Sequence, residues 1–225
     1  MAKVSPWFVV ITAIFVTCLI TANIIAVKLV GVFGLVFPAA MVIFPLSYVI
    51  GDVLTEVYGY ARARSVIWLG FGCNVIAVVA IWLGQMLPAA GFWDGQPAYE
   101  SILGYTPRLL AASFVAYLIG EFANSFILAR MKVATRGRWL WSRTIGSTII
   151  GQGLDEVVFT TLAFAGTGAP LLTMILTKWA LKVAYETAAT PLTYAVVGFL
   201  KGREGSDVYD DATDFSPLAL ASQRQ

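Results

Sequence analysis

The chain has 225 residues, of which 59% are hydrophobic and only 12% are charged, compared with about 25% charged residues in an ordinary soluble domain. Together with a mean hydropathy of +0.79, this composition excludes an ordinary soluble globular protein and places most of the mass inside a membrane. The formal net charge of +2 identifies no partner, and no feature supports nucleic-acid binding.

The absence of histidine and the presence of only two cysteines narrow the chemistry further. Ser-His-Asp and Cys-His nucleophilic sites, HExxH zinc sites and histidine-ligated haem are excluded. Cys18 and Cys73 each lie in an apolar run, and neither is part of a CxxC pair or a metal-binding motif. We therefore expect both thiols to pack in the core, and we expect no metal and no cofactor.

Hydropathy along the chain predicts an all-α polytopic membrane protein, because about 20 apolar residues cross a bilayer core. The six predicted spans cover residues 7–30, 37–58, 66–87, 108–129, 144–166 and 171–200. The first run is too long for the apolar region of a signal peptide, so we expect it to be a true span. Residues 1–201 then form a transmembrane domain, and residues 202–225 form an acidic cytoplasmic tail that we expect to be disordered.

The basic residues predict the orientation of this domain. Ten of the fifteen lysines and arginines lie after the second span, after the fourth span and at the C-terminal end. The loop at 88–107 contains Asp94 and Glu100 and no basic residue. Since Lys and Arg concentrate in cytoplasmic loops, both termini are expected to be cytoplasmic.

Charged residues inside or at the edges of the predicted spans are the most informative feature of the sequence. Each charge near the bilayer centre costs about 2.5–3.5 kcal/mol, so these side chains should face one another or a wet cavity. The residues concerned are Lys28, Asp52, Glu56, Glu121, Asp155, Glu156, Lys178, Lys182 and Glu186.

The spacing of the polar residues places them on shared helix faces, because residues three, four or seven apart lie on one side of a helix. The resulting stripes are Tyr48, Asp52 and Glu56; Ser113, Tyr117, Glu121 and Asn124; Thr148, Gln152, Asp155 and Phe159; and Lys178, Lys182 and Glu186. Asn23 adds a polar group from the first span. We interpret these stripes as the walls of a substrate cavity, and Pro45 and Pro191 favour helix breaks beside it.

Other interpretations remain open at this point. The charges could hold the bundle together through salt bridges such as Lys182 with Asp155, and Glu56 could pair with Arg62 or Arg64. Similar strings at 51–57 and 153–157 give a weak indication of an inverted duplication. An intramembrane aspartate protease is disfavoured, because no glycine immediately precedes Asp155 and no Tyr-Asp motif occurs within a predicted span. A structural assembly protein is the remaining alternative.

Three segments carry a resemblance to a known family: GDVLTEVYG at 51–59 followed by ARAR at 61–64, GQGLDEVVF at 151–159, and LKVAYETAATPL at 181–192. From about residue 23 to residue 201, the chain resembles the queuosine precursor transporter family, also called the vitamin uptake transporter family. The resemblance implies a multi-pass protein of the bacterial inner membrane. It would import 7-cyano- or 7-aminomethyl-7-deazaguanine for tRNA modification, by secondary or facilitated transport, without being an enzyme.

A different class of transport protein remains as the alternative function. A substrate-binding subunit of an energy-coupling-factor vitamin importer is also a small six-helix membrane protein. Such a subunit would need an ATPase from other chains, and the present sequence contains no nucleotide-binding P-loop.

The resemblance also implies roles for particular residues. We expect hydrogen bonds to the substrate from Asn23, Asp52, Gln152, Asp155 and Lys182, with ring stacking on Phe159, Trp179 or Tyr185. The sharpest expectation is that Asp52 and Asp155 contact the substrate, whereas the remaining charges organise the helices or couple transport. These structural or coupling charges are Glu56, Glu121, Glu156, Lys178 and Glu186. The partners expected are a small-molecule substrate and the lipid bilayer. The sequence does not identify a coupling ion. It also leaves the oligomeric state open, and a homodimer is one option.

Overall fold

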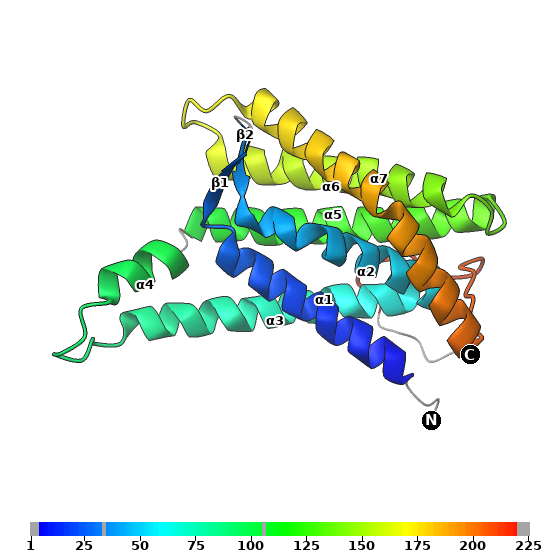
Figure 1. Ribbon diagram of the computed structural model, residues 1–225, viewed down its shortest axis with the longest axis horizontal. Helices are drawn as coiled ribbons and strands as arrows, with labels where there is room; N and C mark the ends of the chain where they lie inside the picture. Colours follow the sequence, from blue (N-terminus) through cyan, green and yellow to red (C-terminus); the bar gives the residue numbers. More distant parts are fainter. Residues whose placement is uncertain (1–4, 33–34, 105–106, 220–225) are drawn as a thin grey trace.

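The computed structural model describes residues 5–32, 35–104 and 107–219, and most of them are helical. The long helices lie side by side in a bundle (Figure 1). The α-helices are α1 (Pro6–Ile25), α2 (Phe44–Tyr58), α3 (Tyr60–Met86), α4 (Gln96–Leu103), α5 (Pro107–Ala134), α6 (Leu140–Phe164) and α7 (Leu171–Glu204).

The segment between α1 and α2 differs from the prediction. Strands β1 (Leu29–Val32) and β2 (Leu35–Pro38) pair antiparallel, and a 3-10 helix, η1 (Ala39–Val42), follows them. The expected spans 7–30 and 37–58 were therefore too long at these ends. Hydropathy detects apolar content but does not separate a short strand from a helix, and this segment is rich in β-favouring residues. Helix α2 has only 15 residues, about 22 Å at 1.5 Å per residue, which is shorter than a bilayer core of about 30 Å.

The two prolines have different effects on their helices. Pro45 lies in the first turn of α2, where a missing backbone N–H is tolerated, so it marks the start of the helix and not an interior break. Pro191 lies inside α7, and Figure 1 shows this helix changing direction along its length. A proline is an ordinary cause of such a bend, because it removes one intrahelical hydrogen bond.

The four later predicted spans match α3, α5, α6 and α7. Three stretches of the described chain are long and apolar enough to cross a membrane: Pro6–Ile25, Tyr60–Met86 and a stretch from Gln96 to Ala134 that includes α5. Helices α6 and α7 have sufficient length but carry several of the charged residues noted above. Helix α4, in the loop at 88–107, was not predicted.

The distribution of polar and apolar side chains differs from that in a soluble protein. Large apolar side chains are exposed on the outside, including Ile76 at 70% and Leu172 at 69%. Polar side chains such as Thr144, Ser147 and Thr193 are completely buried. An apolar exterior around an interior that includes many polar groups is the arrangement expected where lipid replaces water as the solvent.

Glycines allow α5 and α6 to pack closely. A Cβ atom on Gly120 would lie 2.8 Å from Cβ of Asp155, and one on Gly151 would lie 2.7 Å from Cβ of Asn124. Small residues at such contacts let helix backbones approach one another in membranes. This contact holds the polar residues of α5 against those of α6.

The ends of α1 and α7 meet at one end of the bundle. The Ser5 hydroxyl, which caps α1, also donates a hydrogen bond to the Glu204 carboxylate at the end of α7. The α2–α3 turn and the α5–α6 connection lie at the same end, whereas the β-hairpin, α4 and the α6–α7 connection lie at the opposite end (Figure 1).

The C-terminal segment is more ordered than expected, since residues 205–219 fold back on the bundle. The Asp210 carboxylate, 2% exposed, accepts hydrogen bonds from the backbone N–H of Tyr60, at 3.0 and 3.2 Å. Arg64 donates to the carbonyl groups of Asp214 and Ser216, each at 2.8 Å. The expectation of a disordered tail therefore does not hold for this segment, because its acids and carbonyl groups satisfy donors at the basic end of the bundle.

Candidate functional site

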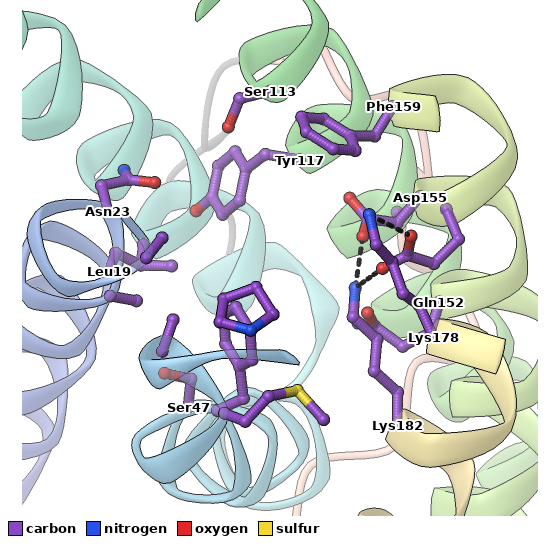
Figure 2. A pocket seen from close by; sticks show the side chains of 18 of the residues that line it. Leu19, Asn23, Ser47, Ser113, Tyr117, Gln152, Asp155, Phe159, Lys178 and Lys182 are labelled. Carbon is purple, nitrogen blue, oxygen red and sulfur yellow. Dashed lines mark hydrogen bonds and ion pairs between the residues drawn. The ribbon is translucent and has the colours of Figure 1, made fainter. Parts of the chain in front are cut away.

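A cavity of about 280 Å³ lies between the helices, with walls from α1, β2, η1, α2, α3, α5, α6 and α7 (Figure 2). Its polar lining residues are Asn23, Ser47, Tyr48, Asn74, Ser113, Tyr117, Glu121, Gln152, Asp155, Glu156, Thr177, Lys178 and Lys182. Its aromatic lining also includes Phe37, Phe44, Phe71, Phe114 and Phe159. The cavity combines charged groups, amides and flat apolar rings.

One wall of the cavity is ionic. Lys182 Nζ lies 2.6 Å from Asp155 Oδ2 and 2.7 Å from Glu156 Oε1. Lys178 Nζ lies 3.7 Å from Glu156 Oε2 and 5.0 Å from the centre of the Phe159 ring. The expected pairing of Lys182 with Asp155 is confirmed. Two acids and two lysines balance here, which lowers the cost of placing these charges inside a membrane.

The facing wall is neutral. Asn23 Nδ2 donates to Asn74 Oδ1 at 2.8 Å, and the Tyr117 hydroxyl donates to the carbonyl oxygen of Ile67 at 3.2 Å. Figure 2 shows Asn23 on one side of the cavity and Asp155 and Lys182 on the other. A bound molecule would therefore meet an amide pair on one side and an ion cluster on the other.

Two polar groups of the wall are available to a ligand. Gln152 is only 5% exposed and lies one helical turn before Glu156, while Glu121 projects from α5. Neither side chain makes a hydrogen bond or an ion pair with another residue of the described ranges. Because buried polar groups are normally satisfied, these two groups are the natural contacts for a polar molecule in the cavity.

The structure brings together five of the eight residues expected to bind substrate, namely Asn23, Gln152, Asp155, Phe159 and Lys182. Three charges expected to be structural or coupling residues also line the cavity: Glu121, Glu156 and Lys178.

The other three expected substrate ligands lie outside the cavity lining. Asp52 is buried between helices and accepts a hydrogen bond from Asn124 Nδ2 at 3.0 Å. The Trp179 indole donates to the carbonyl oxygen of Ile149 at 2.8 Å, so its polar edge is committed to a contact between α7 and α6. Tyr185 is half-buried and does not contribute to the wall.

Sequence reasoning missed most of the aromatic lining. Four of the phenylalanines that line the cavity lie in apolar runs of the sequence: Phe37, Phe44, Phe71 and Phe114. In such a run, a phenylalanine that faces lipid and one that faces a cavity give the same hydropathy pattern. Phe37 also belongs to the unpredicted hairpin. Asn74 could have been found, because it is the main polar residue of its predicted span.

A second ion cluster lies at the basic end of the bundle and is centred on Glu56, which is completely buried. Glu56 Oε1 lies 2.9 Å from Arg143 Nη2, 2.8 Å from Lys201 Nζ and 3.7 Å from Lys132 Nζ. The interpretation that Glu56 pairs with Arg62 or Arg64, which the sequence left open, is therefore wrong. Partners from distant helices surround Glu56, and this cluster joins α2, α5, α6 and α7.

The fold and the cavity define a multi-pass membrane protein with an internal site for a small polar molecule. The chain belongs to the family described as "Putative vitamin uptake transporter", whose model matches residues 38–196.

Two curated relatives are similar to the chain. The "Probable queuosine precursor transporter" of Bacillus subtilis (strain 168) is 29% identical over 191 residues, which cover 83% of each chain. The "Queuosine precursor transporter" of Escherichia coli (strain K12) is 26% identical over 121 residues, covering 54% of this chain and 52% of the relative. No solved structure gives a significant match.

Proposed function

We propose that the protein imports queuosine precursors, the 7-cyano- or 7-aminomethyl-7-deazaguanine bases, across the bacterial inner membrane. Two relatives with this named function support the proposal. The observation that carries it is the cavity itself, where unpaired Gln152 and Glu121 lie beside the Asp155–Lys182 ion pair and the Phe159 ring.

The size of the cavity suits a single base. Its volume of about 280 Å³ lies just below the range of about 300–1,000 Å³ that is usual for small-molecule pockets. A bicyclic base fits such a volume better than a nucleotide, which would add a sugar and charged phosphates. The cavity also contains three acids against two lysines, so it favours a neutral or cationic molecule over an anion.

The chemistry of the wall matches a guanine-like edge. The N–H groups of such a base are donors for the Asp155 or Glu121 carboxylate, and its carbonyl oxygen is an acceptor for the Gln152 amide or Lys182. The flat ring would stack on Phe159. The ammonium of an aminomethyl substituent would pair with Glu121, the carboxylate that lacks a protein partner.

The proposed topology has six membrane passes with both termini in the cytoplasm. Helix α2 together with the hairpin and η1 would form the second pass, and the irregular backbone of this pass lines the cavity, where such backbone is tolerated. The contact between Ser5 and Glu204 and the basic cluster at the same end support a shared cytoplasmic location for the two termini.

The test is the queuosine content of tRNA in a bacterial strain that lacks both precursor synthesis and its own importer. Expression of this chain should restore queuosine when 7-cyano- or 7-aminomethyl-7-deazaguanine is supplied at low concentration. The purified chain, reconstituted alone in vesicles, should exchange labelled base. A requirement for an added ATPase would favour the energy-coupling-factor alternative, and the absence of both restoration and exchange would refute the proposal.

A further inference from the structure

A pair of acidic side chains lies buried outside the cavity lining. Asp52 of α2 is 1% exposed, and Glu186 of α7 is 0% exposed. Helix α2 packs on α7 here, and the two carboxyl groups act on each other electrostatically. The proposed binding of a base uses neither of them.

The oxygen atoms of this pair lack hydrogen-bond donors. Asp52 Oδ1 accepts the bond from Asn124 Nδ2, but Asp52 Oδ2 meets no donor among the described residues. Both carboxyl oxygens of Glu186 and the amide oxygen of Asn124 also meet no hydrogen-bond donor among the described residues. Four buried oxygen atoms without a donor are unusual, because a buried polar group that lacks a partner is costly.

No cation compensates the pair within the part of the chain that the structure describes. The other charged groups acting on Asp52 are Glu121 of α5 and Glu56 of α2, which are also acids. The basic groups of the elements packed around the pair are engaged elsewhere. Lys132, Arg143 and Lys201 pair with Glu56, and Lys178 and Lys182 pair with Asp155 and Glu156. Arg64 and Arg108 donate to backbone carbonyl groups, and Arg62, Arg130 and Arg203 lie over the rings of Phe8, Phe215 and Phe199. Helix α1 contains no charged residue.

Two ionised carboxylates side by side in such surroundings would repel each other strongly. A proton held between them removes one of the two charges, and the resulting O–H group donates a hydrogen bond from one carboxyl group to the other. We propose that Asp52 and Glu186 form a proton-binding site that couples import to the inward movement of protons, an inference that rests on the transport function proposed above.

Glu121 connects this site to the cavity. Its carboxylate lines the cavity, and Oε2 lies 3.6 Å from the position that a Cβ on Gly51 would occupy, next to Asp52 in the chain. Glu121 interacts electrostatically with Asp155 and Lys182 on the cavity side and with Asp52 on the other side. Occupancy of the cavity and protonation of the pair therefore act on the same carboxylate.

The experiment uses the full chain in vesicles with the membrane potential held at zero and with neutral 7-cyano-7-deazaguanine as the probe. An outside-acid gradient of one pH unit should drive about tenfold accumulation if one proton moves with each base, since one pH unit corresponds to a factor of ten. A pH indicator inside the vesicles should report acidification when the base is added.

Glu186→Gln keeps the shape of the side chain and removes the titrating group. This variant should lose both accumulation and acidification, yet it should still exchange external labelled base for internal unlabelled base. Asp52→Asn should also lose accumulation. Glu100→Gln and Asp211→Asn, at exposed positions, are the matched controls and should behave as the parent.

A second measurement needs no substrate. Infrared spectra of the purified parent at neutral pH should contain the carbonyl band of a protonated carboxylic acid, and Glu186→Gln should remove it. The proton site is refuted if this band is absent, if both variants retain gradient-driven accumulation, or if the parent accumulates base only with a sodium gradient. Failure of the parent to exchange any 7-deazaguanine, with the band present, would refute the proposed transport function and not the proton site.

Discussion

Lys182 is tolerated in the interior of the helix bundle because two acids lie within 2.7 Å of its ammonium. Removing the lysine would leave Asp155 and Glu156 facing each other with only Lys178 nearby. Breaking a buried ion pair by deleting one partner typically costs about 3–5 kcal/mol. The stability of the bundle and the shape of the cavity therefore both depend on this side chain.

Lys182→Ala should lower the melting temperature of the detergent-solubilised protein and abolish uptake. Asp155→Asn should reduce the effect of the lysine substitution, because it removes one of the two charges left unpaired. A double-mutant cycle on thermal stability measures the coupling energy between the two positions. Simple additivity of the two substitutions would contradict a direct electrostatic partnership.

Phe159 and Trp179 provide a comparison between an aromatic residue inside the cavity wall and one outside it. Phe159→Ala should weaken binding of 7-deazaguanine by about 1–3 kcal/mol, the usual range for base stacking on an aromatic ring. This corresponds to an increase of about 5- to 150-fold in Kd. Trp179→Phe should leave Kd unchanged, because the Trp179 indole contacts the α6 backbone and not the cavity. Equal losses of affinity from both substitutions would place the base elsewhere.

At the scale of the helices, the contact between α5 and α6 fixes the distance between Glu121 and the ion cluster on α6. The absence of side chains at Gly120 and Gly151 makes this contact close. Gly151→Leu should separate the two helices, since even its Cβ would overlap Asn124. We expect a lower melting temperature and a loss of base binding. Gly72→Leu on α3, where a Cβ meets no atom within 4 Å, is the control and should have little effect on either measurement.

Much of the arrangement of the helices could be predicted from the sequence. Three residues of the predicted stripe on α6, Gln152, Asp155 and Phe159, line the cavity together, because helix geometry places them on one face. Thr148, the fourth residue of that stripe, is buried outside the cavity lining. The same reasoning grouped Tyr48 with Asp52, yet only Tyr48 lines the cavity. One turn further along α2, the neighbouring helices α5 and α7 cover the face that carries Asp52. Packing between segments that are distant in the sequence cannot be predicted from the spacing of residues within one helix.

Two other elements could not be predicted for related reasons. The hairpin at 29–38 is as apolar as a membrane helix, so hydropathy does not distinguish them. The segment 205–219 has the composition of a disordered tail, but its acids meet Lys132, Lys201 and the start of α3. Partners for charged residues that are far apart in sequence become visible only in the folded molecule.

The tail belongs to the scale of the whole molecule, because it joins helices from both halves of the chain. Burial acts to raise the pKa of Asp207, but hydrogen bonds from Lys132 and Lys201 outweigh it and lower that pKa below its ordinary value. A lowered carboxyl pKa stabilises the docked tail above the unfolded pKa of about 3.9, and this contribution is lost as the pH falls through the lower folded value.

Asp207→Asn should therefore loosen the tail at neutral pH and have little further effect in strong acid. Because the Asp207 side chain is 42% exposed, we expect only about 0.5–1 kcal/mol. Hydrogen exchange of residues 205–219 measures this change. Asp211→Asn is the matched control, since Asp211 is exposed and contributes no ion pair among the described residues. Unchanged protection in Asp207→Asn would show that the tail docks without this contact.

The proposed orientation of the whole molecule in the membrane rests on the basic residues at this end of the bundle. Four basic residues lie at the end of the bundle where α1 begins and α7 ends: Arg64, Lys132, Arg143 and Lys201. The connection between α3 and α5, at the opposite end, carries Asp94 and Glu100. Because basic residues are retained on the cytoplasmic side, a reporter that is active only in the cytoplasm should work when fused to the C-terminus. A reporter that is active only after export should work when inserted in the loop at 88–95. The opposite pattern of reporter activity would show that the molecule has the inverted orientation in the membrane. Protons that enter with the base would then have to reach Asp52 and Glu186 from the opposite end of the bundle.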